Sequence, residues 1–406
     1  TYAICKADML IKGQDISKIV LGNTLSNDAF PNEKFDYMLS NPPYGVDWKK
    51  VKDDVETEAK KLGFKGRFGP GLPRISDGQM LFLLHLISKM HPKNSGETSR
   101  IAIVMNGSPL FSGGAGSGES EIRRYILEND VLEAIVALPT EMFYNTGIAT
   151  YIWILSNNKE KRRIGKVQLI NATDFFGKMR RSLGNKRRQF ERDHIAKIVK
   201  EYGTFKDSDY SKLLPNEAFG YNTIVVERPL RLAFQITPER LDALAQEPLL
   251  GKNGINFADL LAALKSMGTR KFTSRTIFLD ALAAALKKAA VSLKPPQYKA
   301  VWQALSERDP DAETCTNAKG EPEADPDLRD TEDVPLNENI ATYVAREVLP
   351  YAPDAWLDAS KTKMGFEIPF TRFFFHFEPP RALAEIESEL NANLQRINEN
   401  VRGITV

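Results

Sequence analysis

Asn41, Pro42, Pro43 and Tyr44 follow one another directly and combine groups that can hold a planar amino group. The side-chain carbonyl of Asn41 and the backbone carbonyl of Pro42 are acceptors for the two N–H groups of such an amine. Two consecutive prolines remove two backbone donors and fix two φ angles, so the loop that aims these carbonyls is stiff. The tetrapeptide predicts a methyl-acceptor site, although a rigid strand-to-loop turn capped by a tyrosine would use the same residues.

The exocyclic amine of adenine is one acceptor that this loop suits. That amine is a poor nucleophile because its lone pair is delocalised into the ring. Acceptors around it hold it nearer tetrahedral geometry and stabilise the charge that develops during methyl transfer. The ring of Tyr44 offers a stacking surface, which enzymes that flip a base out of the duplex require. The motif therefore fits chemistry on a base, and it fits the planar amine of a glutamine amide equally.

The elements around this loop indicate an α/β fold. Residues 35–40 form a short apolar segment, interpreted as a buried strand that ends at the loop, and ligands in open α/β sheets lie beyond the carboxyl ends of strands. The pattern predicts further strands at 101–105, 131–138, 149–155 and 167–171, with helices at 77–90 and 119–128. We expect a mainly parallel sheet with crossover helices, in which the strands at 131–138 and 149–155 pair antiparallel at the sheet edge.

The second half of the chain differs in composition. Helical periodicity at 241–245, 257–265 and 274–288 predicts a helical region. Residues 306–336 are acidic and contain four prolines, which suggests an extended linker. Helices are expected at 337–348 and 380–401. We therefore divide the chain into a partial catalytic domain (1–235), a helical region (236–305), an acidic extended linker (306–336) and a C-terminal helical region for subunit contact (337–406).

The last predicted helix carries a single apolar stripe on an otherwise polar surface. Its members recur at three- and four-residue steps: Leu383, Ile386, Leu390, Leu394, Ile397 and Val401. Such a stripe implies packing, either on the helix's own domain or on a helix of a second subunit.

A basic block follows the predicted strands. Residues 159–192 hold twelve Lys or Arg against three Asp or Glu, within a chain of net charge +2. The block includes Arg162, Arg163, Arg180, Arg181, Lys186, Arg187 and Arg188. These side chains could simply be solvated, but their place after an active-site strand favours contacts with DNA phosphates, which give affinity and salt dependence without sequence choice.

Bulk features exclude several classes of protein. The sequence has neither an 18-residue apolar run nor a signal-peptide pattern, so a membrane role is not expected. Two distant cysteines and four histidines form no metal-ligand spacing, which predicts a cytoplasmic protein without structural zinc.

Several strings together resemble a known family. They are FDYMLSNPPY (35–44), RIAIVMNGSPLF (100–111), LPTEMFYNTGIATYIWIL (138–155), RRSLGNKRRQ (180–189) and EIPFTRFFF (367–375). The chain is similar in these strings to the modification (M) subunit of type I restriction-modification systems. That family belongs to the gamma class of S-adenosylmethionine-dependent N6-adenine DNA methyltransferases, so the resemblance implies their Rossmann-like sheet, their cofactor and double-stranded DNA as partner.

The resemblance also implies roles for single residues. Asn41, Pro42 and Tyr44 would grip the target adenine, with Pro43 stiffening the loop. Phe143 matches a later aromatic motif and would supply a second stacking face, the alternative being a core aromatic between two strands.

The resemblance places three residues near the cofactor. Asn41 would lie beside the methyl donor. Asn23 falls in the region that touches the cofactor's adenine in related enzymes, although an asparagine that satisfies a turn fits equally. Asp77 faces the cofactor pocket or acts as an ordinary helix N-cap, and the cap is the interpretation we prefer.

One departure from the family pattern concerns the methyl donor. The Gly-rich loop and the ribose-binding acid are not found, and the resemblance places Thr1 just downstream of them. We therefore expect a fragment that binds S-adenosylmethionine poorly and is inactive alone.

The resemblance further implies a specificity subunit, a restriction subunit and a second M subunit as partners. Two alternatives stay open. Protein methyltransferases that modify a glutamine amide also use Asn-Pro-Pro-Tyr, and a non-catalytic scaffold could bridge DNA and a partner.

Overall fold

The computed structural model describes residues 2–93, 95–251, 256–377 and 379–404. Its central element is a six-stranded sheet in the order β1-β2-β4-β3-β5-β8. The strands are β1 (Tyr37–Ser40), β2 (Arg100–Asn106), β3 (Leu132–Ala137), β4 (Thr150–Ser156), β5 (Lys166–Asn171) and β8 (Ser211–Pro215). The α/β expectation is confirmed, with each predicted strand within two residues of its expected bounds.

The sheet is mixed rather than mainly parallel. Parallel pairing joins β1 to β2 and β3 to β5, whereas β4 runs antiparallel to both of its neighbours and β8 runs antiparallel to β5. The expected antiparallel pairing of β3 with β4 is confirmed. Its expected place at the sheet edge is wrong, because β4 lies between β2 and β3. As a result β1, β2, β3 and β5 present their carboxyl ends at one edge, which we call the carboxyl edge.

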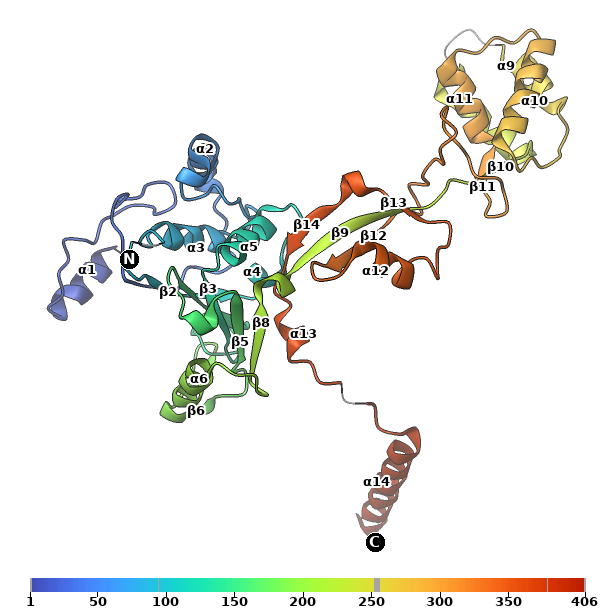
Figure 1. Ribbon diagram of the computed structural model, residues 1–406. Coiled ribbons are helices and arrows are strands. Elements are labelled where there is room, and N and C mark those ends of the chain that lie inside the picture. The colour runs from blue at the N-terminus through green and yellow to red at the C-terminus, as the bar shows by residue number, and fades with distance from the viewer. Residues whose placement is uncertain (1, 94, 252–255, 378, 405–406) are drawn as a thin grey trace.

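Helices cover both faces of this sheet (Figure 1). On one face, α3 (Gln79–Ser88) and α5 (Gly118–Glu128) join Ile103 and Trp153 in the largest apolar core. On the other, α6 (Arg192–Thr204) packs near Val136 and Ile170. Strand β3 is buried along its whole length because its alternate side chains enter both cores, which explains why its sequence is apolar except for the buried Glu133.

Strand β1 departs from the expected buried strand. Met38 is 8% exposed, but Tyr37 and Leu39 are 79% and 85% exposed. The reason is position: β1 lies at an end of the strand order, so only its alternate side chains enter the core.

Before β1 lies α1 (Tyr2–Ile11), and between β1 and α3 lies α2 (Lys52–Leu62). A short helix, α4 (Ser108–Phe111), follows β2, and a hairpin of β6 (Gly177–Leu183) and β7 (Lys186–Gln189) follows β5. No helix among the described residues is long and apolar enough to cross a membrane.

The second half forms two further units (Figure 1). Strand β9 (Gly220–Glu227) pairs with β12 (Asp330–Pro335), β13 (Trp356–Leu357) and β14 (Lys363–Phe366), and α12 (Ile340–Glu347) contributes to the core of this sheet. The outer unit contains the three expected helices as α7 (Pro238–Ala245), α9 (Phe257–Lys265) and α10 (Arg275–Lys288), and two that were not predicted, α8 (Pro248–Gly251) and α11 (Pro295–Ala304). Beside them β10 (Leu232–Phe234) pairs with β11 (Ser306–Arg308).

The segment 306–336 is not an extended linker. It contains β11 and β12, and Cys315 and Asp325 within it are buried. Arg308 holds the Asp325 carboxylate at 2.7 and 2.9 Å, so the acidic composition is compensated by pairing. The C-terminal region likewise contains strands as well as helices. Which parts fold as independent domains stays a prediction.

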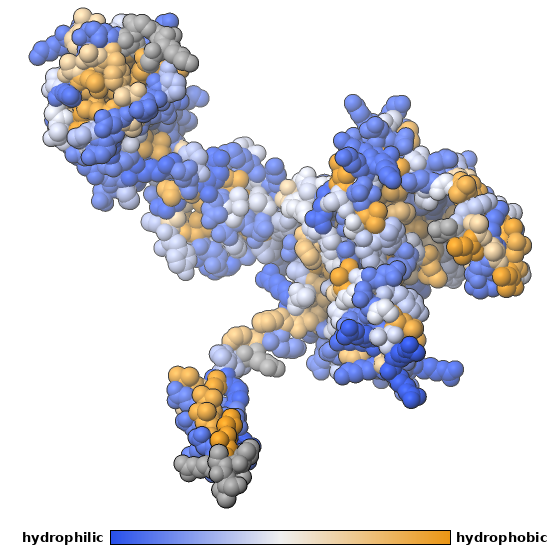
Figure 2. All heavy atoms as spheres, turned by 180° about the vertical axis from the view of Figure 1, so that it is seen from behind, coloured by the Kyte–Doolittle hydropathy of each residue, from blue (hydrophilic) through white to orange (hydrophobic). Residues whose placement is uncertain are grey.

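The chain ends in α13 (Phe370–Phe373) and α14 (Leu383–Ile404). Figure 2 shows α14 standing apart from the rest with an apolar face, and all six residues of its predicted stripe are exposed, between 46% and 71%. Packing on its own domain, the alternative weighed for this helix, is therefore not what the structure shows.

Candidate active site at the carboxyl edge of the sheet

A cavity of about 640 Å³ opens at the carboxyl edge of the sheet. It is lined by the loop that follows β1, by the end of β2 and by the loop between β3 and β4. The lining residues are Asn41, Pro42, Pro43, Tyr44, Gly45, Asn106, Phe143, Tyr144, Asn145, Thr146 and Ile148. All five predicted catalytic residues are among them, because the strands that carry their loops end at one edge.

The loop after β1 is held in a fixed shape. Pro42 is buried while Asn41 and Pro43 are exposed, and Gly45 takes a φ of 60°, which turns the chain directly after Tyr44. Beyond the turn, Gly78 N donates to Val46 O at 3.1 Å, which fastens the loop to the start of α3.

Tyr44 and Asn41 interact directly. The Tyr44 hydroxyl donates to Asn41 Oδ1 at 2.6 Å. Burial raises the pKa of Tyr44 to about 12, so this hydroxyl is a donor and not a base at neutral pH. An amide oxygen has two lone pairs, so Asn41 Oδ1 can accept a second hydrogen bond from a substrate.

Phe143 faces Tyr44 across the cavity. The two ring centroids lie 6.4 Å apart with the planes at 81°, an edge-to-face arrangement. Phe143 is half-buried and also packs against the apolar core beside β3 and β5. It is therefore both a wall of the cavity, as a stacking face requires, and part of the core, as the alternative required. A planar molecule stacked on one ring would meet the edge of the other.

The basic hairpin β6–β7 is hydrogen-bonded to the loop that carries Phe143. Arg187 N and Arg188 N donate to Glu141 O at 3.0 and 3.2 Å, and Asn185 N donates to Tyr144 O at 2.9 Å. Gly184 has a φ of 60°, and a Cβ there would lie 2.6 Å from Tyr144 O, so the hairpin turn requires glycine for this approach. Cationic side chains are thereby brought to the rim of the cavity.

The seven predicted DNA-contacting residues fall into two groups on opposite edges of the sheet. Five belong to the hairpin at the carboxyl edge: Arg180, Arg181, Lys186, Arg187 and Arg188. Arg162 and Arg163 precede β5 and therefore lie at the other edge.

The prediction is wrong for Arg163. Its side chain is 1% exposed, donates to Tyr202 O and to Gln168 Oε1, and stacks 4.4 Å from the Phe205 ring. Arg162 is exposed but pairs with Glu160 at 2.7 Å and donates to Gly203 O. Neither side chain borders the cavity.

The two other predicted cofactor residues do not line the cavity either. Both Asp77 carboxylate oxygens accept from Gln79 Nε2 at 2.8 Å, and Oδ1 also accepts from Gln79 N at 3.2 Å. Asp77 thus binds a backbone N–H at the start of α3, close to the preferred N-cap interpretation, although the N-cap position itself is Gly78.

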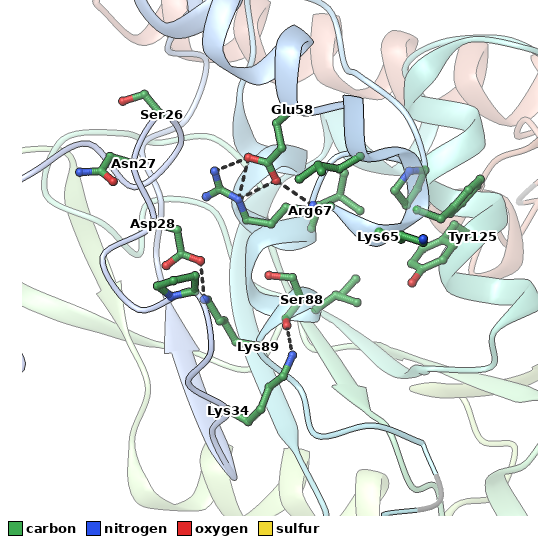
Figure 3. Close-up of a pocket in the computed structure, with 17 residues that line it drawn as sticks. Ser26, Asn27, Asp28, Lys34, Glu58, Lys65, Arg67, Ser88, Lys89 and Tyr125 are labelled. Carbon is green, nitrogen blue, oxygen red and sulfur yellow. Dashed lines mark hydrogen bonds and ion pairs between the residues drawn. The ribbon is translucent and has the colours of Figure 1, made fainter. Parts of the chain in front are cut away.

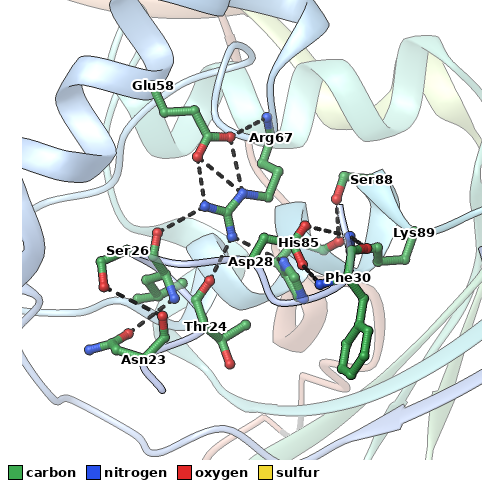
Figure 4. Close-up of polar contacts among 11 residues, drawn as sticks. Asn23, Thr24, Ser26, Asp28, Phe30, Glu58, Arg67, His85, Ser88 and Lys89 are labelled. Atoms are coloured by element: carbon green, nitrogen blue, oxygen red, sulfur yellow. Dashed lines mark hydrogen bonds and ion pairs between the residues drawn. The ribbon is translucent and has the colours of Figure 1, made fainter. Parts of the chain in front are cut away.

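Asn23 lies in a turn. Its Oδ1 accepts from Leu25 N at 3.0 Å and its backbone carbonyl accepts from Asn27 N at 2.9 Å. Figure 4 shows the surrounding network, in which Arg67 donates to Thr24 O and Leu25 O while pairing with Glu58 at 2.6 Å.

Beside this turn lies a separate hollow of about 510 Å³, drawn in Figure 3. Lys89, paired with Asp28, and Lys34, which donates to Ser88 O, stand along its wall. The hollow shares no lining residue with the cavity at the carboxyl edge.

These contacts bear on the methyl donor. The acceptor atoms of Asn23 and Asp77 are engaged by neighbouring protein groups, and neither residue opens onto the cavity of Asn41. The structure therefore does not bring these two residues to Asn41 as a methyl-donor site, and only the acceptor side of a transfer follows from the cavity residues.

Sequence reasoning missed several residues. Asn106 and Tyr144 line the cavity, and buried Gln79 supports it. Asn106 could have been found by the signal that found Asn41, a polar residue directly after an apolar strand. Arg123 was also missed: it is wholly buried and donates to Phe366 O, Pro109 O, Ser112 O and Gly113 O, which ties the helical layer to β14.

The fold and cavity together define an α/β protein with a polar, aromatic-lined acceptor site at the carboxyl edge of its sheet. The family model described as N-6 DNA Methylase matches residues 1–222, more than half of the chain. The chain therefore belongs to the N-6 DNA methylase family.

Curated relatives are methylase subunits of type I restriction enzymes. The MjaIX subunit of Methanocaldococcus jannaschii is 26% identical over 240 residues, covering 59% of this chain and 40% of the relative. The HindI subunit of Haemophilus influenzae is 26% identical over 274 residues, covering 67% and 56%. The chain thus spans about half or less of the length of these relatives.

A solved structure, the type I restriction-modification methyltransferase subunit from Streptococcus thermophilus, is 28% identical with a TM-score of 0.44. The match covers 53% of this chain and 42% of that one.

Proposed function

We propose that this chain provides the methyl-acceptor site of an adenine-N6 DNA methyltransferase, the modification subunit of a type I restriction-modification complex. The observation that carries the proposal is the single cavity that joins Asn41, Pro42, Tyr44 and Phe143. Membership of the N-6 DNA methylase family supports it.

In this proposal the target adenine leaves the duplex and enters the cavity that Tyr44 and Phe143 line. One N6 hydrogen is accepted by the second lone pair of Asn41 Oδ1 and the other by the carbonyl of Pro42. As the methyl group arrives, positive charge grows on the amine, and both acceptors are already in place to stabilise it. The adjacent proline keeps the carbonyl from turning away.

The hairpin β6–β7 would hold the DNA backbone next to the cavity. Six of its residues between 177 and 189 are Lys or Arg and none is acidic. Arg180 and Arg181 are exposed and no ion pair or hydrogen bond joins their side chains to another described residue, so they are available for phosphates. Contacts of this kind position DNA without reading its sequence.

The methyl donor and partners follow from the same proposal. S-adenosylmethionine would supply the methyl group. A specificity subunit would read the DNA sequence, and a restriction subunit and a second modification subunit would complete the complex. The exposed apolar face of α14 is the surface we propose for subunit contact.

The variant Asn41→Ala tests the acceptor site in the full-length chain, assembled into the complex with its specificity partner. We expect methyl transfer to DNA to fall to background, with the circular dichroism spectrum unchanged. Asn27→Ala, which removes another exposed amide outside the cavity, should keep normal rates. Near-normal transfer by Asn41→Ala would make the proposed grip untenable, and label from the methyl donor found only on protein would favour a glutamine amide as the acceptor.

A further inference from the structure

Asn106 lies at the end of β2 and lines the same cavity as Asn41. Its side-chain oxygen is already engaged, because Oδ1 accepts from Ser108 N at 2.9 Å. That hydrogen bond fixes which end of the amide is oxygen, since a backbone N–H needs an acceptor. The NH2 end, Nδ2, has no hydrogen-bond partner in the part of the chain that the structure describes, and it is the donor that Asn106 can offer to a ligand.

A buried relay holds Asn106 in place. Its backbone N–H donates to Gln79 Oε1 at 3.0 Å. Gln79 is fully buried, and its Nε2 donates to both carboxylate oxygens of Asp77 at 2.8 Å, which sets the amide with Oε1 toward Asn106. Asp77 is 8% exposed. The start of α3 thus fixes the end of β2 through side chains and not through the sheet alone.

Nδ2 complements the acceptors already assigned to the site. Asn41 Oδ1 and the Pro42 carbonyl can only accept hydrogen bonds, whereas Asn106 Nδ2 can only donate. In adenine the N6 amine donates and is flanked by N1 and N7, which both accept. Guanine carries an acceptor, O6, where adenine carries its amine, so it would meet the acceptors of Asn41 and Pro42 with the wrong polarity.

We infer that Asn106 is a base-recognition residue, whose Nδ2 donates to a ring nitrogen beside the amine of the target adenine. Gln79 and Asp77 act through Asn106 as positioning residues. The inference rests on the proposed function, and it adds a donor to a site otherwise built from acceptors and rings.

The test uses the assembled complex and DNA with adenine, 1-deazaadenine or 7-deazaadenine at the target position. Asn106→Asp keeps an oxygen for Ser108 N but replaces the NH2 donor by a second acceptor. We expect Asn106→Asp to lower kcat/KM on adenine by about three- to tenfold or more, because one neutral hydrogen bond contributes about that factor. One of the two deaza substrates should cost the wild type a similar factor, and Asn106→Ala should no longer distinguish that substrate from adenine.

Two results would overturn the inference while the wild type methylates adenine. One is normal kcat/KM for Asn106→Asp. The other is a loss in Asn106→Ala of the same factor on adenine and on both deaza substrates, which would mean a structural role for Asn106. If the wild-type complex transfers no methyl group to DNA, the proposed function itself fails and this inference fails with it.

Discussion

The hairpin β6–β7 leads to a quantitative prediction about DNA binding. Arg180 and Arg181 are consecutive in β6, both exposed and without an ion pair among the described residues. Other hairpin cations are engaged: Arg188 donates to Thr140 Oγ1 at 3.0 Å and lies 4.1 Å from the Phe176 ring. The double variant Arg180→Ala/Arg181→Ala therefore removes charge without removing the contacts that hold the Phe143 loop.

The expected magnitude follows from counterion release. Each phosphate that a cation neutralises contributes a slope of about 0.9 to the fall of log K with log salt, so two contacts contribute about 1.8. Between 50 and 200 mM salt, the wild type should then lose about 12-fold more affinity than the double variant. The effect should be the same on any duplex sequence, because phosphates carry no sequence information.

Fluorescence anisotropy with a labelled duplex measures this slope across a salt series. Lys60→Ala/Lys61→Ala is the matched control, because it also removes two adjacent exposed charges. These lysines end α2, which lies on the opposite side of the sheet from β6 in Figure 1. Equal slopes for the wild type and the hairpin variant would refute the proposed phosphate contacts, and equal reductions in both variants would show that only net charge matters.

Three further outcomes are expected. Tyr44→Phe keeps the ring, and its rate of methyl transfer should stay within about threefold of the wild-type rate. Tyr44→Ala removes the ring and should lose the roughly 1–3 kcal/mol that stacking of a base contributes. Equal losses of rate in the two variants would contradict a role for the ring. Arg123→Met leaves four carbonyl oxygens without their donor and should lower the free energy of unfolding, measured in urea, by about 3–5 kcal/mol. The control Arg124→Met changes the neighbouring, more exposed arginine and should lower it by less than about 0.5 kcal/mol. Similar losses in both variants would be evidence against the buried hydrogen bonds. Burial, and to a smaller extent the charge of Arg67, lowers the pKa of His85 to about 4. Below about pH 6.5 the unfolded chain therefore binds a proton at His85 that the folded chain does not bind. The free energy of unfolding should therefore fall as the pH falls from 6.5 toward 4, and His85→Gln should be flatter than wild type between pH 6.5 and 5; parallel curves there would contradict it.

Local sequence was sufficient for features whose cause is local. The Asn41 loop is stiff because of the rings of Pro42 and Pro43, and its hydrogen-bond acceptors belong to adjacent residues. Both features could therefore be proposed without tertiary information. The strands β2, β3 and β4 were found within two residues because buried strands require apolar runs. The resemblance to the N6-adenine methyltransferases rested partly on these same segments, and the family model matches the region that holds them.

Pairing between distant segments could not be read from local composition. Residues 306–336 are acidic and rich in proline, features typical of a linker. However, strand β12 (Asp330–Pro335) pairs with β9, and Asp330 lies opposite Val226 in that pairing. Backbone hydrogen bonds to a distant strand, together with ion pairs such as Arg308 with Asp325, order a segment whose own residues favour extension.

Tertiary structure alone decided which basic residues border the site. Arg162 and Arg187 belong to one block in sequence, but the six residues of β5 lie between them. A strand of that length spans about 20 Å, so it carries the chain from one edge of the sheet to the other. The same geometry brings Asn106 into the cavity of Asn41, because parallel β1 and β2 end at the same edge of the sheet, and the grip predicted from the sequence gains a donor that was not among the predicted residues.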